Sequence, residues 1–340
     1  MAEDYPQDQL EFEEWFATDE ACREYLERLR WPEGFVCPRC QQGKAWRDGR
    51  GRQMCARCLY PVSATAGTIF QDTRTPLRLW FRAAWSLTSQ KHGARALGLQ
   101  RVLGLGSYRT AWSWLHKLRR AMVRPGRDAL SGTVEVDETY VGGLAEGKRG
   151  RGSDHKALVV IAAEEAGRGT GRIRMSRVAD ASALSLEGFV RSAAVPGSRI
   201  HTDGWDGYAG LPGLGYVHTV TVLRGLDSSA PAKLLPRVHR VAALLKRWLL
   251  GTHQGAVRPD HLDYYLDEFT FRFNRRTSRS RGKLFYRLIQ QAVQVEPSPY
   301  RDMIGGKPLC SPNPNGLGVL SSKTQPLTRI TRTKPSPPLG

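Results

Sequence analysis

The feature that most constrains the fold of this chain is a group of four cysteines near the N-terminus. Cys37 and Cys40 form one Cys-x-x-Cys pair, and 14 residues later Cys55 and Cys58 form a second. Two such pairs can surround a tetrahedral zinc ion, and four thiolates leave no open position for a substrate. A segment this short buries too little apolar surface to fold without a metal. We therefore expect residues 31–70 to form a zinc ribbon with a structural metal.

Charge is distributed unevenly along the chain. Residues 1–36 hold 11 acids and 3 bases, although the 340 residues together have a net charge of +19. We expect an acidic amphipathic helix over residues 1–30, followed by a strongly basic remainder. Such an excess favours a polyanionic partner, and nucleic acid is the partner that it fits best. A genome bias toward Arg codons explains part of the Arg count but not the shortage of acids.

No segment of the sequence is typical of export or membrane insertion. The longest apolar run spans residues 157–163, and the N-terminus has no basic region ahead of an apolar stretch. We expect a cytoplasmic protein with no membrane partner.

Residues 76–122 have a helical pattern interrupted by glycines. Pro76 begins the first helix, the second ends at the Gly-Leu-Gly-Ser stretch, and the third follows Ser107. Helices separated by short breaks are typical of a helix-turn-helix unit, with the third helix in the major groove. The basic side chains of this segment are therefore candidate DNA contacts: Arg95, Arg101, Arg109 and Lys117. The alternative is a helical linker with a solvated basic face.

The pattern changes to strands after residue 130. We expect strands over 133–141, 155–163, 172–178, 199–202 and 215–223, and helices over 182–193, 236–250 and 261–273. Three consecutive strands, a helix and a fourth strand resemble the opening order of a ribonuclease-H-like domain. We therefore expect an α/β fold with a mixed sheet over residues 131–290. Residues 305–340 are rich in Pro, Ser and basic residues, which predicts a disordered basic tail.

Acidic residues stand out on two of these strands. Glu135 and Asp137 share one face of their strand, and Glu138 lies on the other. Asp203 ends a short apolar strand, and Gly204 follows it. Carboxylates on an apolar strand repel one another unless a cation joins them, and hard divalent cations prefer carboxylate oxygens. The alternatives are an edge strand with a charged outer face, and a helix N-cap at Asp203.

These motifs together resemble a family of bacterial insertion-sequence transposases. The family has an N-terminal zinc ribbon and a DDE-type, ribonuclease-H-like catalytic domain, and the resemblance covers about residues 15–290. It is carried by the four-cysteine ribbon and by the sequences VEVDETYVGG, HTDGWDGY, LKRWLLGTHQG and HLDYYLDEFTFRFNRR. The resemblance implies two divalent ions, Mg²⁺ or Mn²⁺, with Asp137 as the first ligand and Asp203 as the second.

The third ligand differs from the plain family pattern. In many relatives it lies on a helix seven residues before a Lys, and here His239 has that distance from Lys246. Imidazole suits Mn²⁺ better than Mg²⁺, so His239 either shifts the metal preference or acts on protons. Glu268 is the rival third ligand, because it would keep an all-oxygen site. The alternative for Glu268 is a salt bridge to Arg272 or Arg275 on the same helix.

The resemblance also implies what the protein does. It implies a polynucleotidyl transferase that binds the terminal inverted repeats of its element, hydrolyses a strand at the ends and joins the 3′-hydroxyl to target DNA. The implied partners are double-stranded DNA and further copies of the chain, and the protein would be associated with the nucleoid when it acts. Further basic side chains would contact phosphates: Lys246, Arg247, His253, Arg272, Arg275 and Arg276.

Two other functions stay open. One is a DNA-binding regulator with a zinc ribbon, a helix-turn-helix and an inactive nuclease-like domain. The other is a nuclease of the same fold that cannot join strands. The acids at Glu135, Asp137, Glu138 and Asp203 favour an enzyme, because they would repel DNA unless cations neutralised them.

Overall fold

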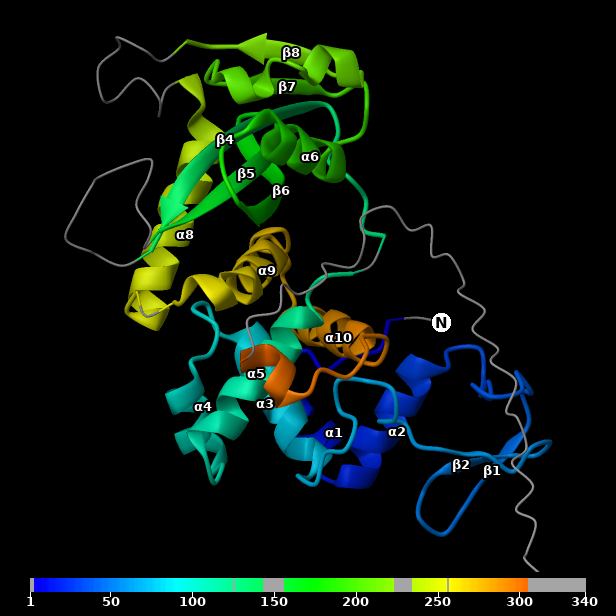
Figure 1. Ribbon diagram of the computed structural model, residues 1–340. Coiled ribbons are helices and arrows are strands. Elements are labelled where there is room, and N and C mark those ends of the chain that lie inside the picture. The colour runs from blue at the N-terminus through cyan, green and yellow to red at the C-terminus, as the bar shows by residue number, and fades with distance from the viewer. Residues whose placement is uncertain (1–2, 125, 143–155, 223–233, 256, 305–340) are drawn as a thin grey trace, which may run out of the picture.

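A computed structural model describes residues 3–124, 126–142, 156–222, 234–255 and 257–304. Figure 1 shows a sheet with its covering helices, a cluster of helices beside it, and a small ribbon of short strands at the side of that cluster. The expected basic tail over 305–340 lies outside the described residues. No helix in the described ranges is both long enough and apolar enough to span a bilayer.

The first part of the chain contains helices and the small ribbon. In chain order these elements are α1 (Gln9–Trp15), α2 (Asp19–Arg30), β1 (Ala45–Arg47), β2 (Gln53–Cys55), β3 (Pro61–Val62), α3 (Leu77–Ser89), α4 (Ala96–Leu103) and α5 (Tyr108–Arg120). The expected acidic helix is in fact two helices. Thr18 accepts a hydrogen bond from the backbone of Ala21 and so begins α2 as a new helix.

An aromatic core holds the helical cluster together. Phe12 stacks on Trp85 at 4.6 Å between ring centroids and meets Phe285 edge-on at 5.4 Å. Phe285 belongs to α10 (Arg281–Ala292), which also buries Leu284 and Leu288 in this core. α10 thus packs on the N-terminal helices, whereas we expected residues 131–290 to form one catalytic unit. The reason is that its apolar face is complementary to the rings of α1 and α3 rather than to the sheet.

The segment over 76–122 forms helices α3, α4 and α5. Gly104 ends α4 in the left-handed conformation, at φ 62°. The side chain of Ser107 accepts a hydrogen bond from the backbone of Thr110 and begins α5. These breaks lie where the sequence predicts them.

The main sheet is mixed and has the strand order β6-β5-β4-β7-β8 in the described part of the chain. Its strands are β4 (Thr133–Val141), β5 (Ala157–Ala166), β6 (Gly169–Val178), β7 (Arg199–Thr202) and β8 (Val217–Val220). β4, β5 and β6 pair antiparallel, whereas β7 and β8 join parallel to β4. This is the mixed α/β, ribonuclease-H-like arrangement that the sequence predicts.

Helices cover both faces of the sheet. The remaining elements are α6 (Ala183–Ala193), short 3₁₀ turns at Asp206–Tyr208, Leu211–Leu214 and Pro259–His261, α8 (Pro236–His253), α9 (Leu262–Phe273) and α11 (Tyr300–Ile304). α8 and α9 pack with Ile161 and Ile173 on one face, and α6 packs with Val136 and Val160 on the other. α9 and α10 lie between the sheet and the helical cluster (Figure 1).

Candidate active site and metal centre

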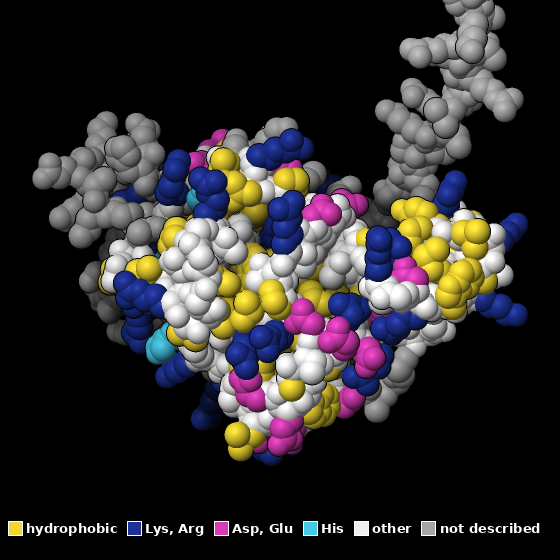
Figure 2. Space-filling view, turned by 90° about the horizontal axis from the view of Figure 1, so that it is seen from below, with side chains coloured by type: hydrophobic (Ala, Val, Ile, Leu, Met, Phe, Trp, Pro, Cys, Tyr) yellow, Lys and Arg dark blue, Asp and Glu magenta, His cyan; other side chains and the backbone are white. Residues whose placement is uncertain are grey.

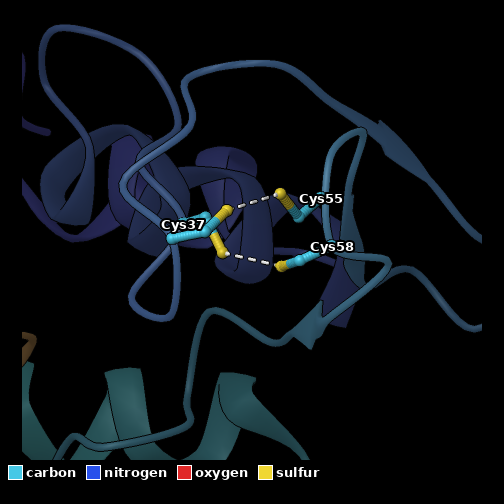
Figure 3. Close-up of side chains that lie close together, drawn as sticks. Cys37, Cys55 and Cys58 are labelled. Atoms are coloured by element: carbon cyan, nitrogen blue, oxygen red, sulfur yellow. Dashed lines mark hydrogen bonds between the residues drawn. The ribbon is translucent and has the colours of Figure 1, made fainter.

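The four cysteines of the ribbon converge on one point. Sγ of Cys37 lies 3.7 Å from Sγ of Cys58, and Sγ of Cys40 lies 3.5 Å from Sγ of Cys55. All four sulfurs lie within 4.8 Å of one another, and Figure 3 shows the sulfurs of the labelled cysteines directed inward from opposite sides of the ribbon. The backbone amide of Cys58 lowers the pKa of Cys55 to about 6, which favours the thiolate that a metal needs. The cysteines are therefore placed to hold a tetrahedral metal.

The ribbon surface combines arginines with exposed apolar side chains. Hydrophobic and basic side chains gather at the right of Figure 2, where the ribbon lies. The exposed apolar residues there are Val36, Trp46, Leu59 and Tyr60. Arg39 lies over the ring of Tyr60, 6.0 Å from its centroid. A surface of this composition suits contact with a nucleic acid or another protein.

The sheet brings two of the predicted acids together. β4 and β7 are parallel and pair Glu135 with His201. Asp203, two residues beyond His201, therefore lies level with Asp137 on the neighbouring strand. Burial, together with the charges of Glu138 and Asp203, raises the pKa of Asp137 to about 7. These crowded carboxylates favour a bound cation.

His239 joins this acidic cluster from the first turn of α8. Its Nε2 lies 3.6 Å from Oδ2 of Asp137 and has no hydrogen-bond partner in the described part of the chain. Burial lowers the pKa of His239, so the neutral ring is available as a ligand at neutral pH. Two carboxylates and a neutral imidazole fit a divalent cation. The cluster is more open than the cysteine site, since its ligand atoms do not all lie within 4.8 Å.

A buried carboxylate on the same strand fixes the start of α8. Glu135 is 3% exposed and accepts hydrogen bonds from the backbone N–H groups of Arg237 and Val238, at 2.7 and 2.9 Å. The Arg237 guanidinium adds a third bond at 2.7 Å. Glu135 therefore positions the helical turn that carries His239. The sequence places Glu135 beside Asp137, but it does not identify Arg237, which lies 102 residues away, as its partner.

The turn after Asp203 is tied to β4. The hydroxyl of Tyr208 is fully buried and donates to Oε2 of Glu138 at 3.0 Å. Gly204 has φ 82°, and a Cβ there would lie 2.7 Å from a methyl group of Val220. Only glycine suits this turn, which holds Asp203 at the end of β7. Tyr208 ends the HTDGWDGY motif, but the sequence does not indicate that its hydroxyl binds Glu138.

Lys246 lies two helical turns from His239 on α8. Its charge lowers the pKa of Asp137, while burial and the charge of Lys156 lower its own. It is therefore within electrostatic reach of the acidic cluster, as its spacing from His239 predicts.

Glu268, the rival third ligand, does not lie in this cluster. It is fully buried on α9, and its Oε2 accepts a hydrogen bond at 2.8 Å from Nε of Arg119 on α5. A second guanidinium, that of Arg272, lies 3.8 Å from Oε1. Glu268 is thus a buried ion-pair partner between two helices. This position does not support the expected role of a metal ligand, because the carboxylate is engaged by Arg119 and Arg272.

The candidate DNA contacts fall into two groups. Arg95, Arg101 and Arg247 are exposed and available to a ligand, and Arg109 is exposed but lies over the ring of Tyr300, 5.0 Å from its centroid. The other candidates are engaged by the protein: Lys117 with the ring of Trp80, His253 with the rings of Trp248 and Tyr265, Arg275 with the ring of Phe271, and Arg276 with the ring of Phe273. Burial lowers the pKa of His253 to about 3, so it carries no charge to attract a phosphate at neutral pH.

Comparisons with known proteins agree with this architecture. Residues 129–274 match the model of the ISXO2-like transposase domain, and residues 17–60 match that of the transposase zinc-ribbon domain. The chain is 26% identical over 288 residues to a Halobacterium salinarum protein described as an uncharacterized protein in transposable element ISH50. That alignment covers 79% of this chain and 94% of the relative. The two matched ranges together span more than half of the sequence, and the chain belongs to the family of insertion-sequence transposases in which a zinc ribbon precedes a DDE-type, ribonuclease-H-like domain.

Proposed function

We propose that this transposase binds the terminal inverted repeats of its element, hydrolyses a strand at each end and joins the freed 3′-hydroxyl to target DNA. The observation that best supports this proposal is the meeting of Asp137, Asp203 and His239. They come from β4, the end of β7 and the first turn of α8, and the fold brings them to one place.

In this proposal Asp137, Asp203 and His239 hold two divalent ions. Magnesium or manganese bound there would activate a water or a 3′-hydroxyl for attack on a phosphodiester. Glu135 keeps His239 in place through the start of α8. Lys246 binds a phosphate beside the reacting group. The imidazole ligand favours Mn²⁺ over Mg²⁺.

Binding of the element ends is assigned to the ribbon and to helices α3–α5. Arg95, Arg101 and Arg109 are exposed at α4 and α5 and make the candidate contacts. Transposition requires both ends to be held together, so we propose that the protein acts as a dimer or a larger assembly on DNA. Zinc is the proposed metal of the cysteine site.

The test is cleavage and strand transfer on a labelled element-end duplex, with Mg²⁺ or Mn²⁺. Asp137→Asn, Asp203→Asn and His239→Ala are each expected to abolish both reactions while DNA binding is retained. The matched control is Asp206→Asn, because Asp206 is an exposed carboxylate of the turn that follows Asp203. His239→Glu supplies an all-oxygen site and is expected to shift the preference toward Mg²⁺.

Three results would contradict the proposal. Full activity of Asp137→Asn would place the chemistry elsewhere. Tight binding of the ends without cutting in either metal would indicate a DNA-binding regulator. Cutting without joining would indicate a nuclease. The thermal midpoint of each variant separates loss of chemistry from loss of folding.

A further inference from the structure

A pocket of about 640 Å³ lies between β6, α9, α10 and the segment that follows α5. Six arginines line it: Arg124, Arg127, Arg172, Arg174, Arg275 and Arg287. We call it the arginine pocket. Two carboxylates, those of Asp128 and Asp267, also line it. Asp267 and Arg275 lie in the motif HLDYYLDEFTFRFNRR, whereas the other residues named here lie outside the motifs that predict the active site.

The arginine pocket is distinct from the acidic cluster. Asp137 pairs with Ile161 across β4 and β5, and Ile161 pairs with Met175 of β6, so their side chains share the sheet face under α8. Arg172 and Arg174 alternate with Ile173 and Met175 along β6, and they therefore point to the opposite face. A ligand of the pocket is consequently not the phosphate that reacts at Asp137.

The pocket carries positive charge that the protein does not neutralise. Arg172 pairs with Glu164, and Arg287 pairs with Glu3. Arg127, Arg174 and Arg275 have no carboxylate oxygen within 4.0 Å in the ranges that the structure describes. Arg174 is 6% exposed. In the described residues its guanidinium donates hydrogen bonds only to the backbone carbonyls of Ile173 and Asp128. A buried cation with no carboxylate in direct contact is costly. The charges of Glu164 and Asp128 offset part of that cost, and an anionic ligand would relieve more of it.

The arginines of the pocket also lie close to one another, and this crowding of positive charges favours an anionic ligand. Burial lowers the pKa of Arg174 to about 10, and the neighbouring charges of Arg127 and Arg172 lower it as well. Burial, Arg287 and Arg124 have the same effect on Arg275. The acids oppose an anion weakly. Burial raises the pKa of Asp267 to about 7, and Asp128 is mostly exposed and lies 3.4 Å from Arg124.

The chemistry of the lining selects a phosphate. A guanidinium fork binds phosphate oxygens in pairs, and several forks here converge on one space. Gln291 is 6% exposed, and its Oε1 has no hydrogen-bond partner in the described residues. This oxygen could accept a hydrogen bond from a sugar hydroxyl, whereas the amide of Asn274 is already bonded to the backbone of Ile173. We propose that the arginine pocket binds a backbone phosphate of DNA away from the reacting strand and so positions the duplex on the protein. This inference rests on the proposed function only in taking DNA as the ligand.

The test measures binding of a fluorescent mixed-sequence duplex to the full chain over a range of salt concentrations. Arg127→Gln and Arg275→Gln, alone and combined, are expected to weaken binding about tenfold per contact. The slope of log affinity against log salt should become less steep by about 0.9 for each lost phosphate contact. Arg168→Gln/Arg191→Gln removes the same charge from exposed positions outside the pocket and should leave the slope unchanged. Thermal midpoints confirm that each variant is folded.

A second arm separates DNA from a small anion, with inorganic phosphate as the probe. One outcome is that phosphate raises the thermal midpoint of the wild type but not of the double variant, while both proteins bind the duplex equally. The pocket would then bind a free anion, and the assignment of DNA as its ligand would be overturned. If neither property changes, the pocket binds no phosphate. Failure of the proposed function would look different: the wild type would bind the duplex with the pocket-dependent slope and yet not cut element ends.

Discussion

At the scale of single residues, the carboxylates of β4 have different roles although they are close in sequence. Asp137 is crowded by Glu138 and Asp203, and its pKa is raised to about 7. Glu135 is more deeply buried, but protein donors satisfy it at the start of α8. Asp137 accepts a hydrogen bond from the backbone N–H of Glu138 at Oδ1, while its Oδ2 faces His239 and suits a metal. Glu135, whose carboxylate is satisfied by protein donors, holds the framework in place.

The role of Glu135 predicts a large loss of stability on substitution. Glu135→Gln should lower the free energy of unfolding by about 3 kcal/mol, because it removes one charge of a buried pair and weakens the bonds to α8. The control is Glu165→Gln, since Glu165 also pairs with Arg237 but is 41% exposed. That change should cost less than about 1 kcal/mol. Urea unfolding followed by circular dichroism measures both. Equal losses would show that Glu135 does not fix α8.

At the scale of elements, the helical segment α3–α5 is joined firmly to the catalytic sheet. Besides the Arg119–Glu268 pair, Nε1 of Trp248 on α8 donates to the carbonyl of His92 at 3.0 Å. Arg272 on α9 donates to the carbonyl of Leu87 at 2.8 Å. The exposed arginines of α4 and α5 therefore have a fixed position relative to the acidic cluster, which is what a protein that cuts at a fixed distance from its binding site requires.

A double-mutant cycle tests this connection. Arg119→Met and Glu268→Leu should each lower the free energy of unfolding by about 3–5 kcal/mol. The first leaves Glu268 with only the longer pair to Arg272, and the second leaves the buried guanidinium of Arg119 unpaired. The double variant should lose much less than the two losses combined. Chemical unfolding of the four proteins gives the coupling energy. Glu268→Leu should also bind as many divalent ions as the wild type. Additive losses, or a lost catalytic ion, would restore Glu268 as a candidate ligand.

Local patterns predicted most of the sheet and its two acids. Alternation along Thr133–Val141 and the short apolar run Arg199–Thr202 predicted the bounds of β4 and β7. The same alternation placed Glu135 and Asp137 on one face and Glu138 on the other, which their contacts confirm. Such features depend on neighbours one or two residues away.

Features that depend on distant partners were not predictable. Glu268 meets Arg119 across 149 residues, and no local pattern separates such a pair from a metal ligand or a surface ion pair. Likewise, the apolar face of α10 indicates that the helix is buried, but it does not indicate whether the sheet or the N-terminal helices cover it. The arginine pocket gathers side chains from four separate segments, so it exists only in the folded chain.

At the scale of the whole molecule, the acidic N-terminal segment neutralises part of the basic chain. Glu13 pairs with Arg82 of α3, and Glu3 pairs with Lys283 and Arg287 of α10. Figure 2 shows Asp and Glu side chains gathered on the helical face, with Lys and Arg around them. Positive charge that these pairs do not neutralise therefore lies on the ribbon, at the exposed arginines of α4 and α5 and in the arginine pocket, where we propose that DNA binds.

The ribbon is attached to the rest by a few contacts with α2, which predicts that it unfolds alone when its metal is removed. Glu27 accepts hydrogen bonds from Arg47 and Gln53, and Arg30 donates to the carbonyl of Ser63. Because its strands are two or three residues long, the ribbon depends on the metal for stability.

Chelation or Cys37→Ser should remove the bound zinc and expose residues 31–62 to protease. The main thermal transition should change little, because Ala64, Ile69 and Phe70, which follow the ribbon strands, stay packed in the helical core. Cys22→Ala is the matched control, since Cys22 is fully buried in the helical cluster and is not a ligand. It should keep the zinc and lower the main thermal midpoint, because it leaves a cavity in that core. Zinc content, limited proteolysis and calorimetry separate the two patterns. If chelation abolished the main thermal transition, the metal would stabilise the entire chain rather than the ribbon alone. If Cys37→Ser kept the zinc content of the wild type, Cys37 would not be a ligand.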